Sequence, residues 1–511
     1  MKTNNIAQNN KRIAKNTLLL YFRMLLIMAV SLYTSRVVLD ALGVEDYGTY
    51  NVVGGVVAMF GFITGPMSGA TQRYITFSLG EGNIKELNKV FCSCINIYMI
   101  ASLLLIITCE VLGVWFLYNK MQIPLESLDT AFWVLQCSLL TTIIMLMTVP
   151  YNADIIAHEK MSAFAYFSIL EVILKLSIVF IIQLVETNRL ILYAILIAGI
   201  QISICLCYII YCRKHFEETK YKWYWNTQLV KEIASFAGWS LYGNLASVGF
   251  TQGLNILLNM FFGTVVNAAR GIAVQVQSTV CSFSSNIQTA INPQITKSFA
   301  SGNIEYMHIL INKSSRLSFF MIYTLSLPIL LETPYILSIW LVNVPEYTVT
   351  FIRLILFSTW IATLANPLIV SMLATGKIKR YQQIVGTILL TIVPISYLFL
   401  KNGFPPYVVY LVTIFIELIA HTARIIMLKK MINLSISNYI KDIITKIILV
   451  IVLSTPIPLL TSIYLQQSFI NFIVVSGLSI MFTMTAIYKV GLMKGEKEYI
   501  KQKIAKRFSN D

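Results

Sequence analysis

A dense group of amide, hydroxyl and guanidinium side chains lies in one stretch of an otherwise apolar chain. These side chains belong to Asn267, Arg270, Gln275, Gln277, Ser278, Ser282, Ser285, Asn286, Gln288, Thr289 and Asn292. At 100° per residue, Arg270 and Ser285 fall on one side of a helix. Ile272 and Ile287 fall on the other side, so the helix is amphipathic. Because lipid does not tolerate such a polar side, we predict that it lines water.

The preceding apolar stretch carries a second polar stripe. Its members, spaced for one face of a helix, are Ser240, Asn244, Ser247, Thr251 and Asn255. Ser, Thr and Asn also join membrane helices through hydrogen bonds worth about 0.6 kcal/mol each, which is the alternative explanation. We favour two neighbouring helices that face a wet cavity, because the stripes are long and one of them includes an arginine.

Ionisable side chains inside apolar stretches are candidates for function, because each costs about 2.5 to 3.5 kcal/mol at the middle of a membrane. Four arginines belong to this group: Arg23, Arg36, Arg270 and Arg353. An arginine near a helix end can instead extend to the lipid headgroups, which we favour for Arg36. Arg270 lies on the polar face of its helix and is our first candidate for binding an anion.

The acidic candidates differ in whether a partner is close in sequence. Glu171 and Lys175 lie four residues apart on one expected helix and can neutralise each other. Glu417 shares a helix face with His421 and Arg424, so an ion pair near the membrane surface is one explanation for that group. Glu417 is nevertheless the deepest acid without a clear partner. We expect it to bind a coupling proton or sodium ion.

The elements that position these residues are membrane-spanning helices. Of the 511 residues, 57% are hydrophobic and 12% are charged, and the mean hydropathy is +0.72. A soluble domain has about 25% charged residues, whereas a run of about 20 apolar residues spans a bilayer. We expect about fourteen such helices, near 17–39, 47–69, 88–112, 130–156, 162–184, 190–211, 233–258, 266–290, 314–331, 348–373, 381–400, 406–428, 442–462 and 468–488.

Basic residues are distributed unevenly between the two sides of the membrane. With loops assigned alternately to the two sides, only Lys120, Arg189 and Lys401 of the 39 Lys and Arg residues fall in outer loops. The inside-positive rule therefore places both termini in the cytoplasm. It also explains the formal charge of +16 without a nucleic-acid partner, which would need basic residues gathered on one solvated surface. The first apolar run has no signal-peptide cleavage site, so we expect it to be retained as a helix.

The chain contains an internal repeat. A shift of 220 residues aligns residues 82–84 with residues 302–304, both of which read Gly-Asn-Ile. Because six helices make up each repeat, the two halves have the same orientation and are related by a pseudo-twofold axis along the membrane normal. We divide the chain into an N-terminal six-helix bundle (1–215), a C-terminal six-helix bundle (216–430) and two additional helices with a basic cytoplasmic tail (431–511).

The sequence contains no recognisable catalytic motif. Its four histidines are scattered, and it has neither a glycine-rich phosphate loop nor clustered carboxylates. The eight cysteines lack metal-ligand spacing, because pairs such as Cys92 and Cys94 point to different sides of a helix. No connection is long enough for the large external loop that carries the catalytic carboxylates of many membrane glycosyltransferases. We therefore expect a protein that is not an enzyme and that needs no cofactor or metal.

The segment after the first expected helix, residues 42–50, reads Leu-Gly-Val-Glu-Asp-Tyr-Gly-Thr-Tyr. It resembles the corresponding loop in the polysaccharide-exporter, or O-antigen flippase (Wzx-like), branch of the multidrug/oligosaccharidyl-lipid/polysaccharide (MOP) flippase superfamily. The turn at residues 150–160 and the two-half layout resemble the same branch. The resemblance covers essentially the whole chain and implies a fold like that of the multidrug exporters called MATE transporters.

The resemblance implies a flippase of the bacterial cytoplasmic (inner) membrane. Such a protein moves a polyprenyl-pyrophosphate-linked oligosaccharide, an O-antigen or capsule repeat unit, from the inner to the outer leaflet by alternating access. Its cationic cavity binds pyrophosphate through arginines and sugar through amides and hydroxyls. We assign this cavity to Arg270, Arg23, Arg353, Asn244, Asn255, Ser285 and Gln288. The sequence departs from the family in having few basic residues inside its spans, and no single arginine matches a site residue of the family.

The expected partners are a lipid-linked oligosaccharide, membrane lipids and glycan polymerase machinery, and we expect the protein to act as a monomer. Two other functions stay open. A cation-coupled multidrug exporter of the same superfamily would have a more apolar or acidic cavity. A membrane glycosyltransferase or polymerase would act on lipid-linked sugar in detergent, and the lack of a long external loop argues against it.

Overall fold

The computed structural model consists of α-helices joined by short connections. It describes residues 16–30, 34, 37–38, 61–119, 128–184, 188–341, 343–493 and 495–498. None of these residues forms a β-strand, and eleven of the described helices are long and apolar enough to cross a membrane. The predicted class, an all-α polytopic membrane protein, is confirmed.

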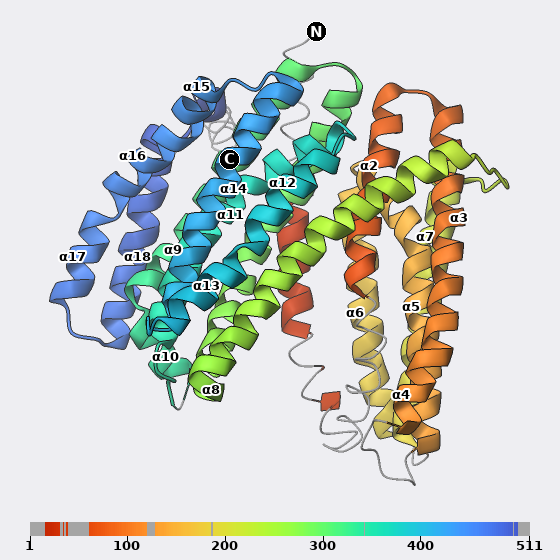
Figure 1. The fold of residues 1–511 in the computed structure, drawn as a ribbon, viewed down its shortest axis with the longest axis horizontal. Coiled ribbons are helices and arrows are strands. Elements are labelled where there is room, and N and C mark those ends of the chain that lie inside the picture. The colour runs from red at the N-terminus through yellow and green to blue at the C-terminus, as the bar shows by residue number, and fades with distance from the viewer. Residues whose placement is uncertain are drawn as a thin grey trace, which may run out of the picture. The chain divides into compact units, whose positions relative to one another are not determined.

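The chain forms two compact units, whose helices are labelled in Figure 1. The first unit consists of Met1–Asn244 with Thr296–Asn303, and the second consists of Leu245–Ile295 with Ile304–Asp511. The long helix α8 (Thr227–Ala300) contributes to both units. The three-part division of the chain expected from its sequence stays a prediction.

The first unit is built from helices that follow one another along the chain. Besides the described segment Asn16–Val30, they are α2 (Gly61–Glu81), α3 (Ile84–Thr108), η1 (Cys109–Gly113), α4 (Val114–Asn119), α5 (Leu128–Ala157), α6 (Met161–Gln183), α7 (Arg189–His215), η3 (Glu217–Thr219) and the first part of α8. Helix α5 packs most extensively against α7 and α2.

The second unit contains the middle of α8 and every later helix. These are α9 (Ile304–Leu331), α10 (Thr333–Trp340), α11 (Thr348–Ala374), α12 (Lys379–Leu390), α13 (Ile392–Lys401), α14 (Val408–Ile432), α15 (Ile436–Tyr439), η4 (Ile440–Ile444), α16 (Thr445–Ser454), α17 (Pro456–Tyr464), α18 (Phe469–Ala486) and η5 (Ile487–Gly491). Helix α11 packs against α9 and α14, and α18 packs against α9 and α16.

Eleven of the fourteen predicted spans coincide with the long apolar helices of the structure. The described part of the first span is a shorter apolar helix, Asn16–Val30, and α2 includes the described end of the second. The eighth is the part of α8 that follows Gly263. Its many polar side chains explain why it is less apolar than the others.

Two predicted cytoplasmic loops are largely helical. Residues 71–88, which connect the second and third predicted spans, are instead the end of α2, a turn of two residues and the start of α3. Most of residues 211–231, which connect the sixth and seventh predicted spans, belong to α7, η3 and α8. Hydropathy marks only the part of a helix that lies in lipid. Once a helix is nucleated, its backbone hydrogen bonds continue through polar residues outside the lipid.

The repeated Gly-Asn-Ile sequence forms the same kind of helix-to-helix turn in both places. Gly82 and Gly302 have φ angles of +77° and +73°, which a glycine adopts without the steric cost of a Cβ atom. Asn83 caps α3, because its side-chain oxygen accepts hydrogen bonds from the backbone of Lys85 and Glu86. The internal repeat therefore preserves a turn with a clear structural purpose.

Helix α8 changes direction at Gly263. This residue has a φ of +77° and a ψ of −165°, which are not helical values and which a residue with a side chain rarely adopts. The break falls between the two spans expected at 233–258 and 266–290. The two polar stripes predicted from the sequence thus lie on two consecutive helical segments, Thr227–Gly263 and residues 264–300.

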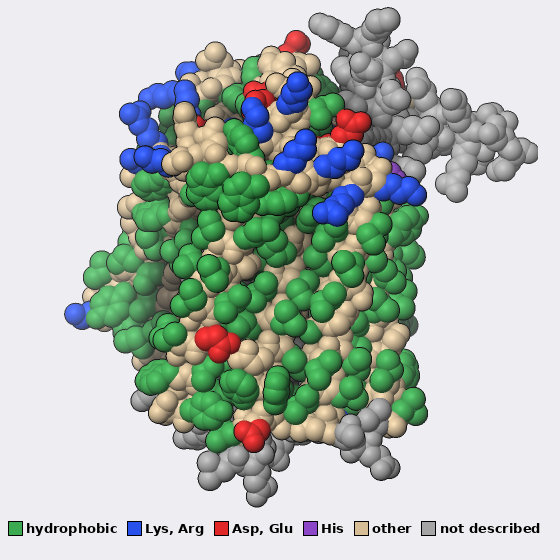
Figure 2. All heavy atoms as spheres, turned by 90° about the vertical axis from the view of Figure 1, so that its right-hand side faces the viewer, with side chains coloured by type: hydrophobic (Ala, Val, Ile, Leu, Met, Phe, Trp, Pro, Cys, Tyr) green, Lys and Arg blue, Asp and Glu red, His purple; other side chains and the backbone are tan. Residues whose placement is uncertain are grey.

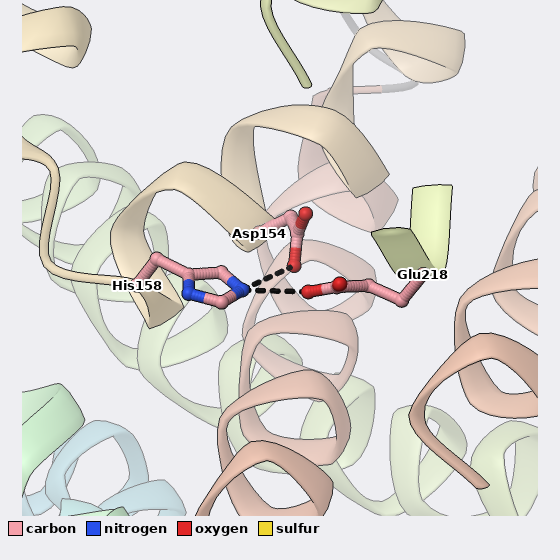
Figure 3. Close-up of side chains that lie close together, drawn as sticks. All are labelled: Asp154, His158 and Glu218. Atoms are coloured by element: carbon pink, nitrogen blue, oxygen red, sulfur yellow. Dashed lines mark hydrogen bonds and ion pairs between the residues drawn. The ribbon is translucent and has the colours of Figure 1, made fainter. Parts of the chain in front are cut away.

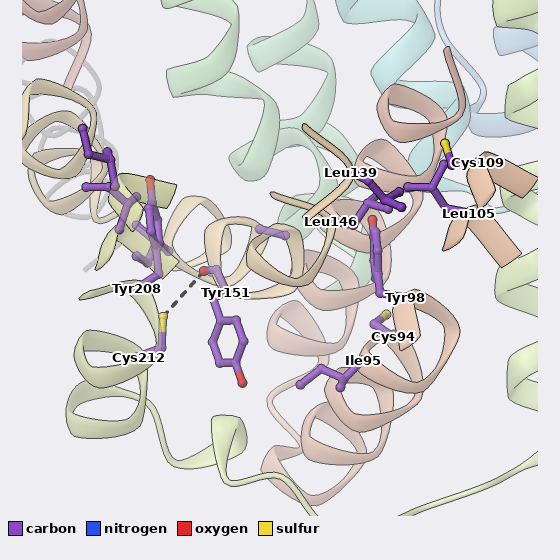
Figure 4. Close-up of a cluster of buried hydrophobic side chains, with 14 of the residues drawn as sticks. Cys94, Ile95, Tyr98, Leu105, Cys109, Leu139, Leu146, Tyr151, Tyr208 and Cys212 are labelled. Carbon is purple, nitrogen blue, oxygen red and sulfur yellow. Dashed lines mark hydrogen bonds between the residues drawn. The ribbon is translucent and has the colours of Figure 1, made fainter. Parts of the chain in front are cut away.

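The core of the first unit is apolar and includes several tyrosines and cysteines (Figure 4). Tyr98, Cys94 and Cys212 are at most 1% exposed. The Cys212 thiol donates to the backbone carbonyl of Tyr151 at 3.6 Å, which joins α7 to α5. The eight cysteines are free thiols, in agreement with their interpretation as small packing residues.

One face of the protein has a broad band of exposed hydrophobic side chains (Figure 2). Helix α3 exposes Leu103, Leu104 and Ile107. Lysine and arginine side chains gather at one end of this face, beyond the band. Such a band suits contact with lipid tails, because water would be an unfavourable solvent for it.

Two features named in the sequence cannot be placed. The segment 42–50, on which the resemblance to polysaccharide exporters rests in part, lies outside the described residues, and so does Arg36.

Candidate functional site

Arg270 lies at the centre of a hydrogen-bond network inside the second unit. Its side chain is 4% exposed. The guanidinium donates from Nε to Oδ1 of Asn255 at 2.5 Å and from Nη2 to the backbone carbonyl of Thr251 at 3.0 Å. A third, longer contact of 3.5 Å runs from Nη1 to the hydroxyl of Tyr410, whose ring centroid lies 5.7 Å away. Among the described residues, no carboxylate forms a salt bridge with Arg270.

This network uses neutral partners to hold a positive charge. The carbonyl of Thr251 and the amide oxygen of Asn255 carry partial negative charge, and the ring of Tyr410 adds a weak cation–π contact. These groups satisfy the guanidinium without neutralising it. The charge of Arg270 is therefore not balanced by an ion pair with any carboxylate that the structure describes.

The second part of α8 exposes a polar stripe. Gln275, Ser278 and Ser285 are exposed and Ser282 is half-buried, at alternating spacings of three and four residues. On the opposite side of this segment, residues such as Ala273 belong to the core of the second unit. This part of α8 is therefore amphipathic, but Arg270, which the sequence placed on the polar face, is buried.

The serines of this stripe can still bind a ligand. Ser278, Ser282 and Ser285 donate their hydroxyl hydrogens to backbone carbonyls of the preceding turn at 2.6 to 2.9 Å. A hydroxyl oxygen has two lone pairs, so each of them can accept a hydrogen bond from a ligand. Together with the amide of Gln275, the stripe offers donors and acceptors of a kind that a polyhydroxylated molecule can use.

Two further amide residues of the predicted site differ in burial. Gln288 is 7% exposed and donates to the backbone carbonyl of Thr363 at 3.5 Å, so it joins α8 to α11. Asn244 is half-buried and lies in the first unit, at the boundary that divides α8. Two of the seven predicted cavity residues, Arg270 and Asn255, are joined by a hydrogen bond in the described part of the chain.

The other two predicted arginines lie in different surroundings. Arg23, in the first unit, lies over the ring of Phe164 with 4.3 Å between the guanidinium carbon and the ring centroid. Arg353, in the second unit, is exposed and donates from Nε to the backbone carbonyl of Leu330 at 3.1 Å. Both remain candidates for anion binding, since neither forms a salt bridge with a described carboxylate.

Glu417 accepts a short hydrogen bond from a neighbouring helix. The hydroxyl of Ser358 on α11 donates to Oε2 of Glu417 on α14 at 2.6 Å. His421, one turn further along α14, makes a 3.3 Å contact through Nε2 with the hydroxyl of Tyr439. Arg424, the third residue of this helix face, forms a side-chain hydrogen bond with Tyr381 on α12, so the three residues have separate hydrogen-bond partners.

Sequence reasoning missed the residues that orient Arg270 from elsewhere in the chain. Tyr410 lies 140 positions away on α14, and nothing in its local sequence marks it. Thr251 belongs to the predicted polar stripe, but its contribution is a backbone carbonyl rather than its hydroxyl. The spacing of 15 residues between Asn255 and Arg270 could have suggested their pairing, because a break at Gly263 lets two helices fold back on each other.

Comparisons with known proteins identify the fold. No protein-family model matches the sequence, and no curated protein matches it. Among solved structures, the chain is similar to the outward-facing conformation of a multidrug resistance MATE family transporter of the MOP superfamily. The TM-score is 0.70 at 14% identity, over 83% of this chain and 96% of the other.

Two further solved structures give the same result. MATE in the bent conformation matches with a TM-score of 0.69 at 13% identity, over 83% of this chain and 96% of the other. The MATE transporter ClbM in complex with Rb+ matches with a TM-score of 0.63 at 13% identity, over 84% and 96%. The MATE-like fold expected from the sequence is confirmed, and the similar proteins are transporters rather than enzymes.

Proposed function

We propose that this protein is a flippase for a polyprenyl-pyrophosphate-linked oligosaccharide. The observation that carries the proposal is the exposed stripe of Gln275, Ser278, Ser282 and Ser285 on an amphipathic helix of a transporter fold. Such a stripe is unfavourable against lipid tails and favourable against a hydrated, hydroxyl-rich substrate. The stripe contains no carboxylate, so nothing in it repels a pyrophosphate.

Arg270 supplies the anion-attracting charge in this proposal. Its neutral partners leave the guanidinium cationic, and a cation in a low-dielectric environment attracts a phosphate group over several ångströms. The residue is too buried to serve as an open phosphate clamp in the present conformation. Its field can nevertheless favour the entry of an anion near α8, and rearrangement during alternating access can expose the guanidinium.

The proposal includes the setting in which the protein works. The protein would lie in the bacterial cytoplasmic membrane with both termini in the cytoplasm and act as a monomer beside glycan polymerase machinery. The uneven distribution of Lys and Arg residues supports this orientation. Proteolysis of intact spheroplasts should leave tags at both termini uncleaved, and cleavage of either tag would reverse the orientation.

A multidrug exporter is the second candidate. The observation in its favour is that one similar solved structure is described as a multidrug resistance transporter. At 14% identity this likeness concerns the fold alone. Deletion of the gene separates the two functions. A flippase defect removes surface glycan and leaves drug resistance unchanged, whereas an exporter defect lowers resistance to cationic drugs and leaves the glycan intact.

Replacing the exposed serines of α8 tests the flippase proposal directly. The double variant Ser278→Leu/Ser285→Leu makes the stripe apolar without burying a polar group, so the protein should still fold. We expect transport of a fluorescent lipid-linked oligosaccharide in proteoliposomes to fall by about tenfold or more, the loss of about 1.4 kcal/mol of favourable contact.

The matched control is Ser203→Leu on α7. Ser203 is exposed and, like the stripe serines, donates its hydroxyl to a backbone carbonyl of the preceding turn, that of Gly199 at 2.9 Å. The control should transport at the wild-type rate. Normal transport by the double variant of α8 would remove the main support for the proposed substrate path.

Glu417 provides a test of ion coupling. Glu417→Gln keeps an oxygen that can accept the hydrogen bond from Ser358 but removes the ionisable group. We expect transport driven by a proton or sodium gradient to fall about tenfold, whereas exchange without a gradient continues. Transport should be measured in proteoliposomes with each gradient imposed separately.

The control for this experiment is Glu171→Gln. Glu171 also lies inside a span, but it is paired with Lys175 at 2.6 Å on the same helix. This variant should keep its dependence on the gradient. If Glu417→Gln keeps that dependence as well, Glu417 is a packing residue and the coupling ion binds elsewhere.

A further inference from the structure

Three side chains with metal-binding chemistry converge at one end of the first unit (Figure 3). Asp154 lies in the last turn of α5, His158 directly follows that helix, and Glu218 lies in η3 after α7. One ligand atom from each of them lies within 4.8 Å of the others. The Nε2 atom of His158 is 2.6 Å from Oε1 of Glu218 and 3.8 Å from Oδ1 of Asp154.

Asp154 is the residue that points to a ligand. Its side chain is 0% exposed, and neither carboxylate oxygen has a hydrogen-bond partner among the described residues. Figure 3 shows the carboxylate directed toward the space between His158 and Glu218. A fully buried carboxylate without a hydrogen bond is costly, so such a group normally binds a cation or a strong donor.

The surrounding charges favour a divalent ion. Oε1 of Glu218 lies 2.6 Å from Nε2 of His158, so the carboxylate and the imidazole already face each other. Lys297 also acts electrostatically on Asp154, but its ammonium group is paired with Glu159 at 3.0 Å. Metal binding requires deprotonated carboxylates and a neutral imidazole, so Asp154 and Glu218 would offer a bound ion two negative charges.

We propose that Asp154, His158 and Glu218 form a binding site for a divalent transition-metal ion of the zinc class. One imidazole nitrogen with two carboxylate oxygens is a three-ligand set of the kind that zinc accepts, with water as the fourth ligand. Calcium and magnesium favour six or more oxygen ligands and do not suit an imidazole. The site does not depend on which substrate the protein transports.

The ligand atoms need only small shifts to surround the ion. In a tetrahedral site with bonds of 2.0–2.1 Å, ligand atoms are about 3.3 Å apart. The contact between His158 and Glu218 would open by about 0.7 Å, and that between His158 and Asp154 would close by about 0.5 Å. A carboxylate can make such a shift by rotating its side chain.

Metal binding would fix the connection between α7 and α8. This connection is already attached to α3, because Asn88 donates to the backbone carbonyls of Glu218 and Lys220 at 2.6 and 3.0 Å. On its other side, the ring of His158 stacks on Phe216 with centroids 4.1 Å apart. A metal ion would add a bond from the same connection to the end of α5, so zinc should make the protein more resistant to heat.

Calorimetry on the purified full-length protein in detergent tests this proposal. After treatment with a chelator, titration with zinc chloride should show one high-affinity ion per chain. His158→Asn and Glu218→Gln should each weaken zinc binding by about 100-fold or more, since each removes a ligand. Cobalt chloride should produce the visible absorption of a tetrahedral site in the wild type only.

Two neighbouring residues serve as matched controls. Glu217 and His215 are exposed and lie next to the cluster in sequence, so Glu217→Gln and His215→Asn should bind zinc as the wild type does. If His158→Asn does not fold, the zinc-dependent rise in melting temperature, compared between the wild type and Glu218→Gln, gives the same answer. The proposed site would be overturned if the wild type does not bind zinc, or if His158→Asn and Glu218→Gln bind zinc as tightly as the wild type does. The three side chains would then form a hydrogen-bonded network without a metal ion.

Discussion

Arg270→Ala should abolish the appearance of lipid-linked glycan on the outer leaflet. The substitution removes the positive charge from the buried network on α8, and no other residue of this network is charged. It also removes the hydrogen bonds that the half-buried Asn255 and the carbonyl of Thr251 accept from Arg270, each worth about 1 kcal/mol. Loss of transport in this variant alone could therefore follow from instability.

Asn255→Asp separates the charge of Arg270 from its structural role. A carboxylate at this position can still accept the hydrogen bond from Nε, but it neutralises the guanidinium. If the charge attracts pyrophosphate, this variant should fold as well as the wild type and transport at least about tenfold more slowly. The measurements are flipping in proteoliposomes and the melting temperature of the purified protein.

Tyr410→Phe is the control for the same network. It removes the hydroxyl that lies 3.5 Å from Nη1 but keeps the ring and the charge of Arg270. Transport should change little. Full activity of Asn255→Asp would contradict a role for the positive charge and make Arg270 a structural residue that joins α8 to α14.

Some of this site could be predicted from sequence because it follows local periodicity. Ser278, Ser282 and Ser285 recur every three or four residues, and that spacing alone places them on one face of a helix. The repeated Gly-Asn-Ile likewise predicted a repeated element, and both copies form a turn around a glycine with positive φ. Local rules of this kind do not depend on which helices become neighbours.

The remaining contacts depend on packing between distant segments. Arg270 meets Tyr410 only because α8 lies beside α14, and Asp154 meets Glu218 only because α5 lies beside α7. Hydropathy also gave the wrong extent for the ends of α2 and α7, since the helix continues there through polar residues. The residue types predicted that Arg270 could bind an anion, but the sequence did not predict which distant residues contact Arg270 or Asp154.

A buried ion pair near the end of the chain should have the largest effect on stability. Arg316 on α9 is 1% exposed and donates from Nη2 to both carboxylate oxygens of Glu496 at 2.7 Å. Glu496 also accepts from the backbone of Met493 at 2.8 Å. We expect Glu496→Ala to lower the free energy of unfolding by about 3 kcal/mol, because it leaves a buried guanidinium without its counter-ion.

We attribute the destabilisation of Glu496→Ala to the unpaired charge of Arg316 rather than to the lost attraction between the two side chains. A double variant distinguishes these two explanations. Arg316→Met/Glu496→Met replaces both charges with apolar side chains and should recover most of the stability lost in Glu496→Ala. Glu498→Gln, at an exposed neighbouring position, should behave as the wild type. Unfolding can be followed by titration with sodium dodecyl sulfate and by thermal size-exclusion chromatography.

The ion pair between Arg316 and Glu496 also tests whether the last two predicted spans are a structural part of the second unit. The same α9 helix contacts α16 through Tyr323, whose hydroxyl lies 3.0 Å from that of Ser454 and 2.7 Å from that of Thr455. If the final helices are a structural part of the second unit, Glu496→Ala should destabilise that unit and reduce transport with it. If transport persists while the end of the chain becomes sensitive to protease, the final helices are an attachment that the transport cycle does not need.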